Sequence, residues 1–263
     1  MNDINRINNT PKTINREYKS ATMGCQFECK YCFSKWGSIP SKTIDIHEDN
    51  KITVFYPLCD SELGNQSMHE LETLVQERIN INSDGKKLIV SISTKDARFA
   101  THIPFLSKLH KAVSTTGGFV KLGVSFTNIS YDSLEQGTAS FEERITLLDI
   151  LSKFDFKLSV VLKPILPFVA VDEYIKIVER SSNYVNNYLI GGLYVEKDND
   201  FYNTYIKDNK DKYNATSRTV AWLNNTSHLY IGSEEIQTEI ACYIASIGKK
   251  VYSSDIEMIE TWM

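Results

Sequence analysis

The chain alternates between short runs of β-branched and aromatic residues and segments whose apolar residues recur at helical spacing. The first kind favours strands and the second favours amphipathic helices. Strands are expected near residues 16–21, 51–57, 87–94, 119–127, 156–162 and 188–195, with helices in the gaps after residue 57. Repeated βα units form a parallel sheet with right-handed crossovers and outer helices. The pattern predicts an α/β fold, a partial (β/α)6 TIM-like barrel, with its chemistry at the carboxyl ends of the strands.

This rhythm stops after residue 195. Residues 196–225 are rich in Asn, Asp, Lys and Tyr and indicate a polar loop or short surface helices. A short strand (HLYIG), an amphipathic helix and a last strand at 250–253 are expected after it. We therefore expect three parts: a flexible N-terminal segment at 1–15, a barrel at 16–195, and a short C-terminal α/β extension packed on the barrel at 196–263.

Composition gives weaker limits on function. The formal net charge of -4 provides no overall basic field for nucleic acid, although a local basic groove can lie within an acidic total. No apolar run approaches the roughly 20 residues of a membrane span. The first residues, MNDINRINNT, lack the apolar core of a signal peptide. A cytoplasmic protein without a membrane partner is expected.

Three of the five cysteines, Cys25, Cys29 and Cys32, form a C-x3-C-x2-C run after the first expected strand. An odd number of cysteines in a cytoplasmic protein speaks against a disulfide framework. Metal ligation is therefore the leading interpretation. Iron–sulfur clusters are held by thiolates, and three cysteines on one loop can bind three irons of a cubane and leave the fourth open. An open iron is what a cofactor-binding catalytic cluster requires.

Two other interpretations of the cysteine run stay open. Zinc prefers C-x2-C pairs and a fourth ligand, for which His47 is the nearest candidate. A simple electron-transfer cluster needs a fourth cysteine, and both Cys59 and Cys242 are isolated in the sequence. The alternative function is thus a non-catalytic iron–sulfur electron-transfer or zinc-binding module.

The segment GCQFECKYCF resembles the cysteine loop of the radical S-adenosylmethionine (SAM) superfamily. The blocks STKDARFA, VSFTNISYDSLEQGTASFEERITLLDIL and LKPILP then resemble, in order, the spore photoproduct lyase-like branch of that superfamily. Together these blocks span about residues 18–170. The resemblance implies a [4Fe-4S] cluster on Cys25, Cys29 and Cys32, with SAM on its open iron. Reductive cleavage of SAM would give a 5′-deoxyadenosyl radical that abstracts hydrogen from a substrate.

The same resemblance suggests residues that would bind SAM. Lys95, which with Thr94 closes the third strand, would pair with the SAM carboxylate. Ser125, at the end of the fourth strand, is a candidate for the carboxylate or the ribose. Asp60 and Glu62 follow the second strand, where superfamily members place acceptors for the SAM ammonium. The structural alternatives are solvated charges and a hydroxyl bonded to its own strand.

Further candidates surround the cysteines. Tyr31 and Phe33 flank the last cysteine and are expected to contact adenine, with simple packing as the alternative. Cys59 is the candidate hydrogen-atom donor, although a buried thiol is the commoner fate of a lone cysteine. Glu135 and Arg144 match the branch pattern, but such a pair is more often structural.

The substrate is not identified by these patterns. In the branch, the second strand is followed by Asp-Pro and a downstream Glu, whereas here only Pro57 and Glu62 match. A DNA lesion, a peptide and a small molecule all stay open as substrates. Residues 202–213 are expected to be a solvated surface or, for a DNA substrate, part of a nucleic-acid groove. The resemblance also implies an electron donor such as flavodoxin or ferredoxin.

Overall fold

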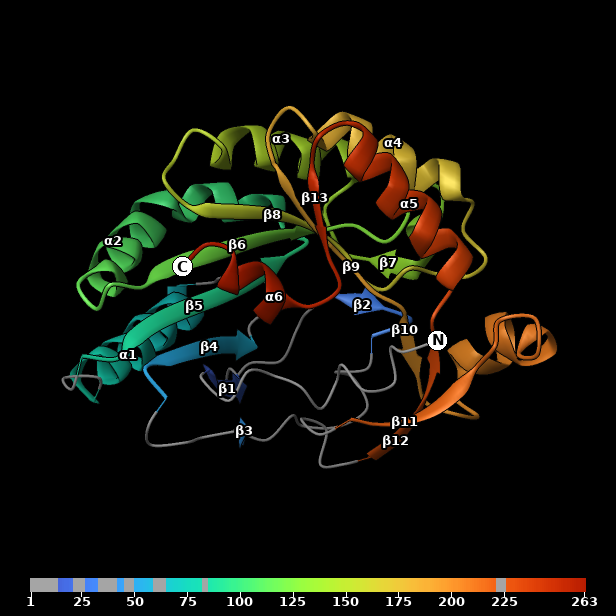
Figure 1. The fold of residues 1–263 in the computed structure, drawn as a ribbon, viewed down its shortest axis with the longest axis horizontal. Coiled ribbons are helices and arrows are strands. Elements are labelled where there is room, and N and C mark those ends of the chain that lie inside the picture. Colours follow the sequence, from blue (N-terminus) through green and yellow to red (C-terminus); the bar gives the residue numbers. More distant parts are fainter. Residues whose placement is uncertain are drawn as a thin grey trace.

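A curled, largely parallel sheet forms the centre of the computed structural model, which describes residues 14–20, 27–32, 42–44, 50–58, 65–81, 85–220 and 226–263. The sheet has eight strands in the order β13-β9-β8-β6-β5-β4-β1-β3 (Figure 1). Their bounds are β1 Ile14–Ser20, β3 Lys42–Ile44, β4 Ile52–Leu58, β5 Lys87–Thr94, β6 Phe119–Ser125, β8 Lys157–Leu162, β9 Asn187–Ile190 and β13 Lys250–Tyr252. All of these strands are parallel to their neighbours except β3, which pairs antiparallel with β1. The half-barrel predicted from the sequence is confirmed.

Helices cover the two faces of the sheet unequally. The long helices are α1 Asn65–Ile81, α2 Ile103–Ser114, α3 Phe141–Leu151, α4 Val171–Ser181 and α5 Glu234–Ser246, and α6 Asp255–Glu260 is shorter. Figure 1 shows α1 to α5 along the outer, convex side. In contrast, α6 packs on the inner face, where Ile256 and Ile259 join an apolar cluster with Ile14, Ile89 and Phe119. Within the described parts of the chain, none of the helices is long and apolar enough to cross a membrane.

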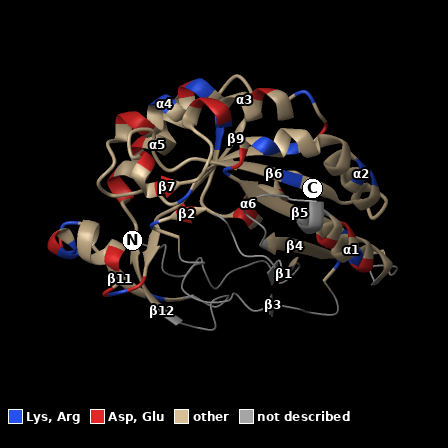
Figure 2. Cartoon of the chain, turned by 180° about the vertical axis from the view of Figure 1, so that it is seen from behind, with Lys and Arg blue, Asp and Glu red and all other residues tan. Residues whose placement is uncertain are grey.

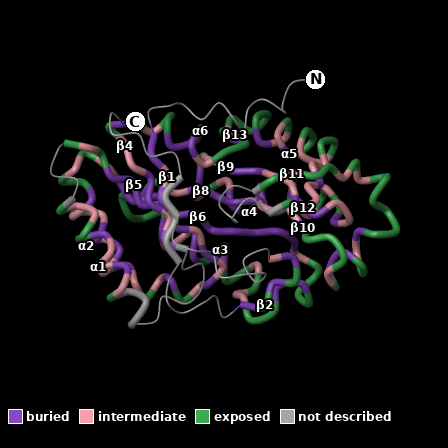
Figure 3. The backbone as a smooth tube through the Cα atoms, turned by 90° about the horizontal axis from the view of Figure 1, so that it is seen from below, coloured by how far each residue is buried: buried purple, intermediate pink, exposed green. Residues whose placement is uncertain are grey.

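The sequence explains these elements locally. The strand β5 reads KLIVSIST and is buried along most of its length, as parallel strands covered on both faces usually are. Figure 3 shows buried positions along the central strands and exposed ones on the outer helices and turns. The helix α3 begins at the capping box expected from the sequence. The Ser140 hydroxyl accepts a hydrogen bond from the backbone N–H of Glu143, and the Glu143 carboxylate accepts one from the backbone N–H of Ser140.

The inner face becomes more polar toward the carboxyl ends of the strands. Inner-face positions, two residues apart, read Ile89, Ser91, Ser93 and Lys95 along β5, and Phe119, Lys121, Gly123 and Ser125 along β6. Ile89 and Phe119 pack with α6, whereas Lys121 forms an ion pair with Asp255 of α6 at 2.6 Å. The apolar part of the inner face is therefore closed by α6, and the polar part lies toward the carboxyl ends.

The strand expected at 188–195 is divided between two sheets. The strand β9 ends at Ile190, and β10 (Leu193–Val195) belongs to a separate sheet with β11 (Thr216–Val220) and β12 (Thr226–Ile231). A Cβ on Gly191 would lie 2.4 Å from Cε of Lys163, and one on Gly192 would lie 2.2 Å from the carbonyl oxygen of Ile231. Because neither glycine has a side chain, Lys163 and Ile231 can approach the backbone here, and the chain passes from the main sheet to the three-stranded sheet at this point.

The C-terminal part also departs from the expectation. The strand β13 pairs parallel with β9 and is a seventh parallel strand of the main sheet, so part of the segment expected as an extension belongs to the half-barrel. Residues 196–225 were expected to be polar loop or surface helices. A short π-helix at Tyr202–Ile206 and the turn at Lys207–Asn209 agree with this, but Phe201, Tyr202 and Ile206 are buried. The division at residues 15 and 195 stays a prediction.

The close approach at Gly192 gives a test of the three-stranded sheet. Gly192→Ala should lower the free energy of unfolding by about 2 kcal/mol, because the added methyl group meets a backbone carbonyl that cannot move independently. Gly232→Ala is the matched control, since its Cβ would have no neighbour closer than 3.4 Å. Urea denaturation of both variants measures the difference. Equal stability of the two would contradict the described packing of β10 on β12.

Candidate functional site

The described part of the cysteine loop is attached to the barrel by a short strand pair. The strand β2 (Glu28–Cys29) pairs antiparallel with β7 (Glu135–Gln136), so that Cys29 lies opposite Glu135 (Figure 1). The backbone N–H of Lys30 donates to the carbonyl oxygen of Leu134 at 2.9 Å. A second hydrogen bond, from Cys32 N–H to the Cys29 carbonyl oxygen at 3.1 Å, closes a tight turn between the two cysteines. Both thiols are therefore fixed to the connection between β6 and α3.

The chemistry of these thiols fits a bound cation. Cys29 is buried and Cys32 half-buried. Burial raises the pKa of the Cys29 thiol to about 11, although Lys95 acts in the opposite direction. A coordinated metal ion supplies the positive charge that keeps such a thiol ionised. Cys25 lies outside the described residues, and the residues that the structure describes contain no complete group of three metal-binding side chains.

A buried carboxylate, that of Glu135, connects the cysteine turn to the sheet. It accepts hydrogen bonds from the hydroxyl groups of Tyr31 and Thr127. Its second oxygen accepts from Arg144 at 2.8 Å. Arg144 also donates to the carbonyl oxygen of Ser125, the last residue of β6, at 2.8 Å. Tyr31, in the cysteine turn, is therefore held at the carboxyl end of β6.

Electrostatics keep this carboxylate ionised. Burial alone would raise the pKa of Glu135, but Lys95 and Arg144 hold it below its usual value. Burial and the neighbouring Glu135 raise the pKa of Tyr31, so its hydroxyl stays protonated and can donate. Glu135 is 5% exposed and Arg144 4% exposed. The ion pair is therefore almost completely removed from water, where its loss would be costly.

The structure brings three of the expected cofactor-binding residues together. Lys95 Nζ donates to Ser125 Oγ at 2.9 Å, lies 3.9 Å from the Glu135 carboxylate, and stands 5.7 Å from the centre of the Tyr31 ring. Thr94 differs, because its hydroxyl accepts from the backbone N–H of Asp96 at 3.0 Å and so stabilises its own turn. The binding roles expected for these residues stay predictions. Five further candidates lie outside the described residues: Cys25, Phe33, Cys59, Asp60 and Glu62.

Aromatic side chains from three other segments extend the site, and the sequence did not identify them as a group. Phe201 meets the Tyr31 ring edge-on with ring centres 6.3 Å apart. Tyr205 packs on Phe201 and stacks on Phe168, each with ring centres 5.0 Å apart. Phe168 in turn contacts the exposed Tyr131. The segment after β10 thus lies against the cysteine turn and restricts the movement of Tyr31.

Thr127 and Asn128 also belong to the site, although the sequence favoured Ser125 over Thr127 and did not indicate Asn128. Thr127 is fully buried and accepts from the Asn128 side chain at 3.2 Å. Asn128 in turn accepts from the backbone N–H of Tyr131 at 2.9 Å, which shapes the loop after β6. Because Thr127 follows Ser125 by two residues, the alternation of a strand places both side chains on the same face, and this spacing predicts Thr127 beside Ser125.

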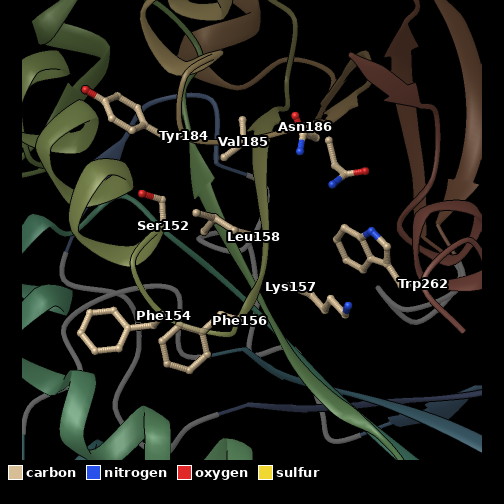
Figure 4. A pocket seen from close by; sticks show the side chains of 10 residues that line it. Ser152, Phe154, Phe156, Lys157, Leu158, Tyr184, Val185, Asn186 and Trp262 are labelled. Atoms are coloured by element: carbon tan, nitrogen blue, oxygen red, sulfur yellow. The ribbon is translucent and has the colours of Figure 1, made fainter. Parts of the chain in front are cut away.

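A separate cavity lies at the opposite end of the sheet. Figure 4 shows it between the start of β8, at Phe156 and Lys157, and Trp262. Its volume of about 240 Å³ is below the usual range of ligand pockets. It lies at the amino ends of the strands, so it does not belong to the candidate site.

Comparisons with known proteins identify the fold. No family model matches the chain, and no curated protein matches its sequence. Solved structures of spore photoproduct lyase do match its fold. The complex with dinucleoside spore photoproduct has a TM-score of 0.59 and 15% identity, covering 88% of this chain and 74% of that chain. A double variant with bound AdoMet and dinucleoside spore photoproduct has a TM-score of 0.60 and 15% identity, covering 89% and 76%. The chain therefore has the spore photoproduct lyase fold.

The buried ion pair predicts a large effect of Arg144→Met. The variant should lower the free energy of unfolding by about 3 kcal/mol, because it leaves the Glu135 carboxylate without its closest cation. Arg180→Met is the matched control, since its ion pair with Glu142 is exposed and should contribute little. Adding Glu135→Gln to Arg144→Met should recover part of the loss. Urea denaturation that gives equal losses for both arginine variants would contradict the role of burial.

Proposed function

We propose that the chain is a radical SAM enzyme, with a [4Fe-4S] cluster on Cys25, Cys29 and Cys32. The observation that carries the proposal is the position of the Cys29–Cys32 turn in a spore photoproduct lyase fold, beside Lys95 and Ser125 at the carboxyl ends of β5 and β6. Ligands of barrel enzymes bind at this end of the strands. We also propose a cytoplasmic location, where thiols stay reduced and able to bind metal.

The residues present fit both expected cofactors. A buried thiol and its neighbour on one tight turn suit a soft metal centre. When bound, the cluster would supply the electron that cleaves SAM and releases a 5′-deoxyadenosyl radical. Lys95 and Ser125 together would hold the carboxylate of SAM through a charge-assisted hydrogen bond and a hydroxyl. As the resemblance implies, Asp60 and Glu62 would bind the amino group of SAM, and Tyr31 and Phe33 would contact its adenine.

The remaining described residues would position these groups. Glu135 and Arg144 hold Tyr31 and the end of β6 in fixed relation, so the cysteine turn and the SAM-binding residues keep their distance. Phe201 packs on Tyr31 and would limit the access of water. Cys59 is the proposed hydrogen-atom donor. Flavodoxin or ferredoxin is the proposed source of electrons.

For the substrate we propose three chemical classes rather than one compound. Two of the matching lyase structures contain a dinucleoside spore photoproduct, so a nucleic-acid lesion is one candidate beside a peptide and a small molecule. In Figure 2 basic and acidic residues are mixed over the helices, which gives no extended basic surface there. A short or single-nucleotide contact would suit this surface better than a long duplex.

SAM cleavage after reconstitution tests the proposal. The protein is treated with iron and sulfide without oxygen, then reduced in the presence of SAM, and 5′-deoxyadenosine is measured by mass spectrometry. Cys29→Ala should lose both the cluster absorbance and the product, because one of the three ligands is missing. Cys242→Ala, an exposed cysteine on α5, should retain both. A cluster without SAM cleavage, or stoichiometric zinc in its place, would favour the non-catalytic module.

The role of Lys95 is testable separately. Lys95→Met should weaken SAM binding by about tenfold or more, because one charge-assisted hydrogen bond is lost. The cluster's electron paramagnetic resonance signal without SAM should be unchanged. Lys153→Met, which removes an exposed ion pair between the turn after α3 and Asp149 of that helix, serves as the control. Unchanged SAM affinity in Lys95→Met would remove Lys95 from the cofactor site.

A further inference from the structure

A second lysine faces the inside of the half-barrel at the carboxyl end of β8. Val161 points inward and packs with Met258 of α6, and Lys163 follows two residues later on the same face. Lys163 Nζ donates to the carbonyl oxygen of Ser253 at 3.0 Å, across the sheet beyond β13. The stem of Lys163 crosses β9 at Gly191, where a Cβ would lie 2.4 Å from its Cε. The absence of a side chain on Gly191 thus leaves space for the lysine.

The acidic groups facing Lys163 already have other partners. Asp255, on α6, lies 2.6 Å from Nζ of Lys121 on β6 and accepts a hydrogen bond from Ser91 at 2.9 Å. Glu257 accepts from the backbone N–H and the hydroxyl of Ser253 at 3.1 Å. Among the described residues, the Ser253 carbonyl is the hydrogen-bond acceptor found for Lys163. Two of its three N–H donors are therefore available to a ligand there.

The environment of Lys163 suits a group that binds an anion. Burial lowers its pKa to about 8, and the nearby Lys121 contributes in the same direction, while Asp255 opposes the shift. The side chain is still only half-buried, so it lies deep among protein groups while keeping contact with solvent. A cation in this position gains stability from a counter-ion.

We propose that Lys163 binds an oxyanion of the substrate, a phosphate or a carboxylate, inside the half-barrel. This rests on the proposed function, in which Lys95 and Ser125 hold the carboxylate of SAM on the same inner face. The inner face then carries two cationic positions at the carboxyl ends of its strands. One serves the cofactor and the other orients the substrate.

Anion binding to the full chain before cluster reconstitution tests this site. Inorganic phosphate and succinate are titrated separately at constant ionic strength and followed by isothermal titration calorimetry. We expect binding of at least one anion with a stoichiometry near one, and Lys163→Met should weaken it by about tenfold or more. Lys157→Met, at the exposed start of β8, should bind as the unaltered protein does. Binding of phosphate alone indicates a phosphorylated substrate, and binding of succinate alone a carboxylate.

The pH dependence provides a second readout. Succinate binding should weaken between pH 7 and pH 9, because Lys163 loses its proton in this range while succinate stays fully ionised. The charged groups that face Lys163 are Asp255 and Glu257 from α6 and Lys121 from β6. Despite burial, Lys121 holds the pKa of Asp255 below its usual value, so Asp255 does not titrate between pH 7 and pH 9. Lys163→Arg keeps its charge and should bind without this decline.

Two outcomes would overturn the anion site. One is that neither anion binds the unaltered protein, and the other is that Lys163→Met binds as tightly as the unaltered protein. Since no cluster is needed for this measurement, a failure here is separable from a failure of SAM cleavage. Circular dichroism of each variant checks that the fold is retained, and Lys163→Arg keeps the test decisive if Lys163→Met does not fold.

Discussion

The ionised carboxylate of Glu135, removed from water, is the constraint on which the candidate site depends. A buried charge is tolerated only when donors surround it, and here each donor comes from a different segment. Tyr31 comes from the cysteine turn, Thr127 from the loop after β6, and Arg144 from α3. Satisfying one carboxylate therefore brings three distant parts of the chain into a single arrangement. The positions of Cys29 and Cys32 follow from that arrangement.

The curled sheet separates two kinds of chemistry. Its outer face is apolar and covered by α1 to α5, so it supplies most of the core. Its inner face is apolar where α6 packs, and in β5 and β6 it carries lysine and serine side chains toward the carboxyl ends. Because inner and outer residues alternate along each strand, the same strands supply both surfaces. Rigid outer packing thus supports a polar inner surface that would not be stable alone.

Local signals predicted the fold well, and long-range contacts account for what was missed. The alternating strand and helix patterns predicted six parallel strands, and the pair Ser140 and Glu143 predicted the start of α3. Both signals depend only on residues that are neighbours in the sequence. The break at Gly192 depends on its close contact with Ile231. The pairing of β13 with β9 likewise joins segments that are far apart in the sequence. Within the site, resemblance suggested Lys95 and Ser125, which do meet. The contact of Phe201 with Tyr31 joins segments that no local pattern relates.

The packing of α6 has a consequence for synthesis on the ribosome. The inner apolar cluster combines Ile14, near the beginning of the sequence, with Ile256 and Ile259, near its end. Among the described residues, α6 is what covers these inner apolar side chains of β1, β4, β5 and β6, so this packing forms only after α6 has been translated, and contacts of such long sequence separation form slowly. A nascent chain would expose this apolar surface until α6 follows and would be open to misassembly. Chaperone binding during translation would protect the half-barrel at its most vulnerable stage.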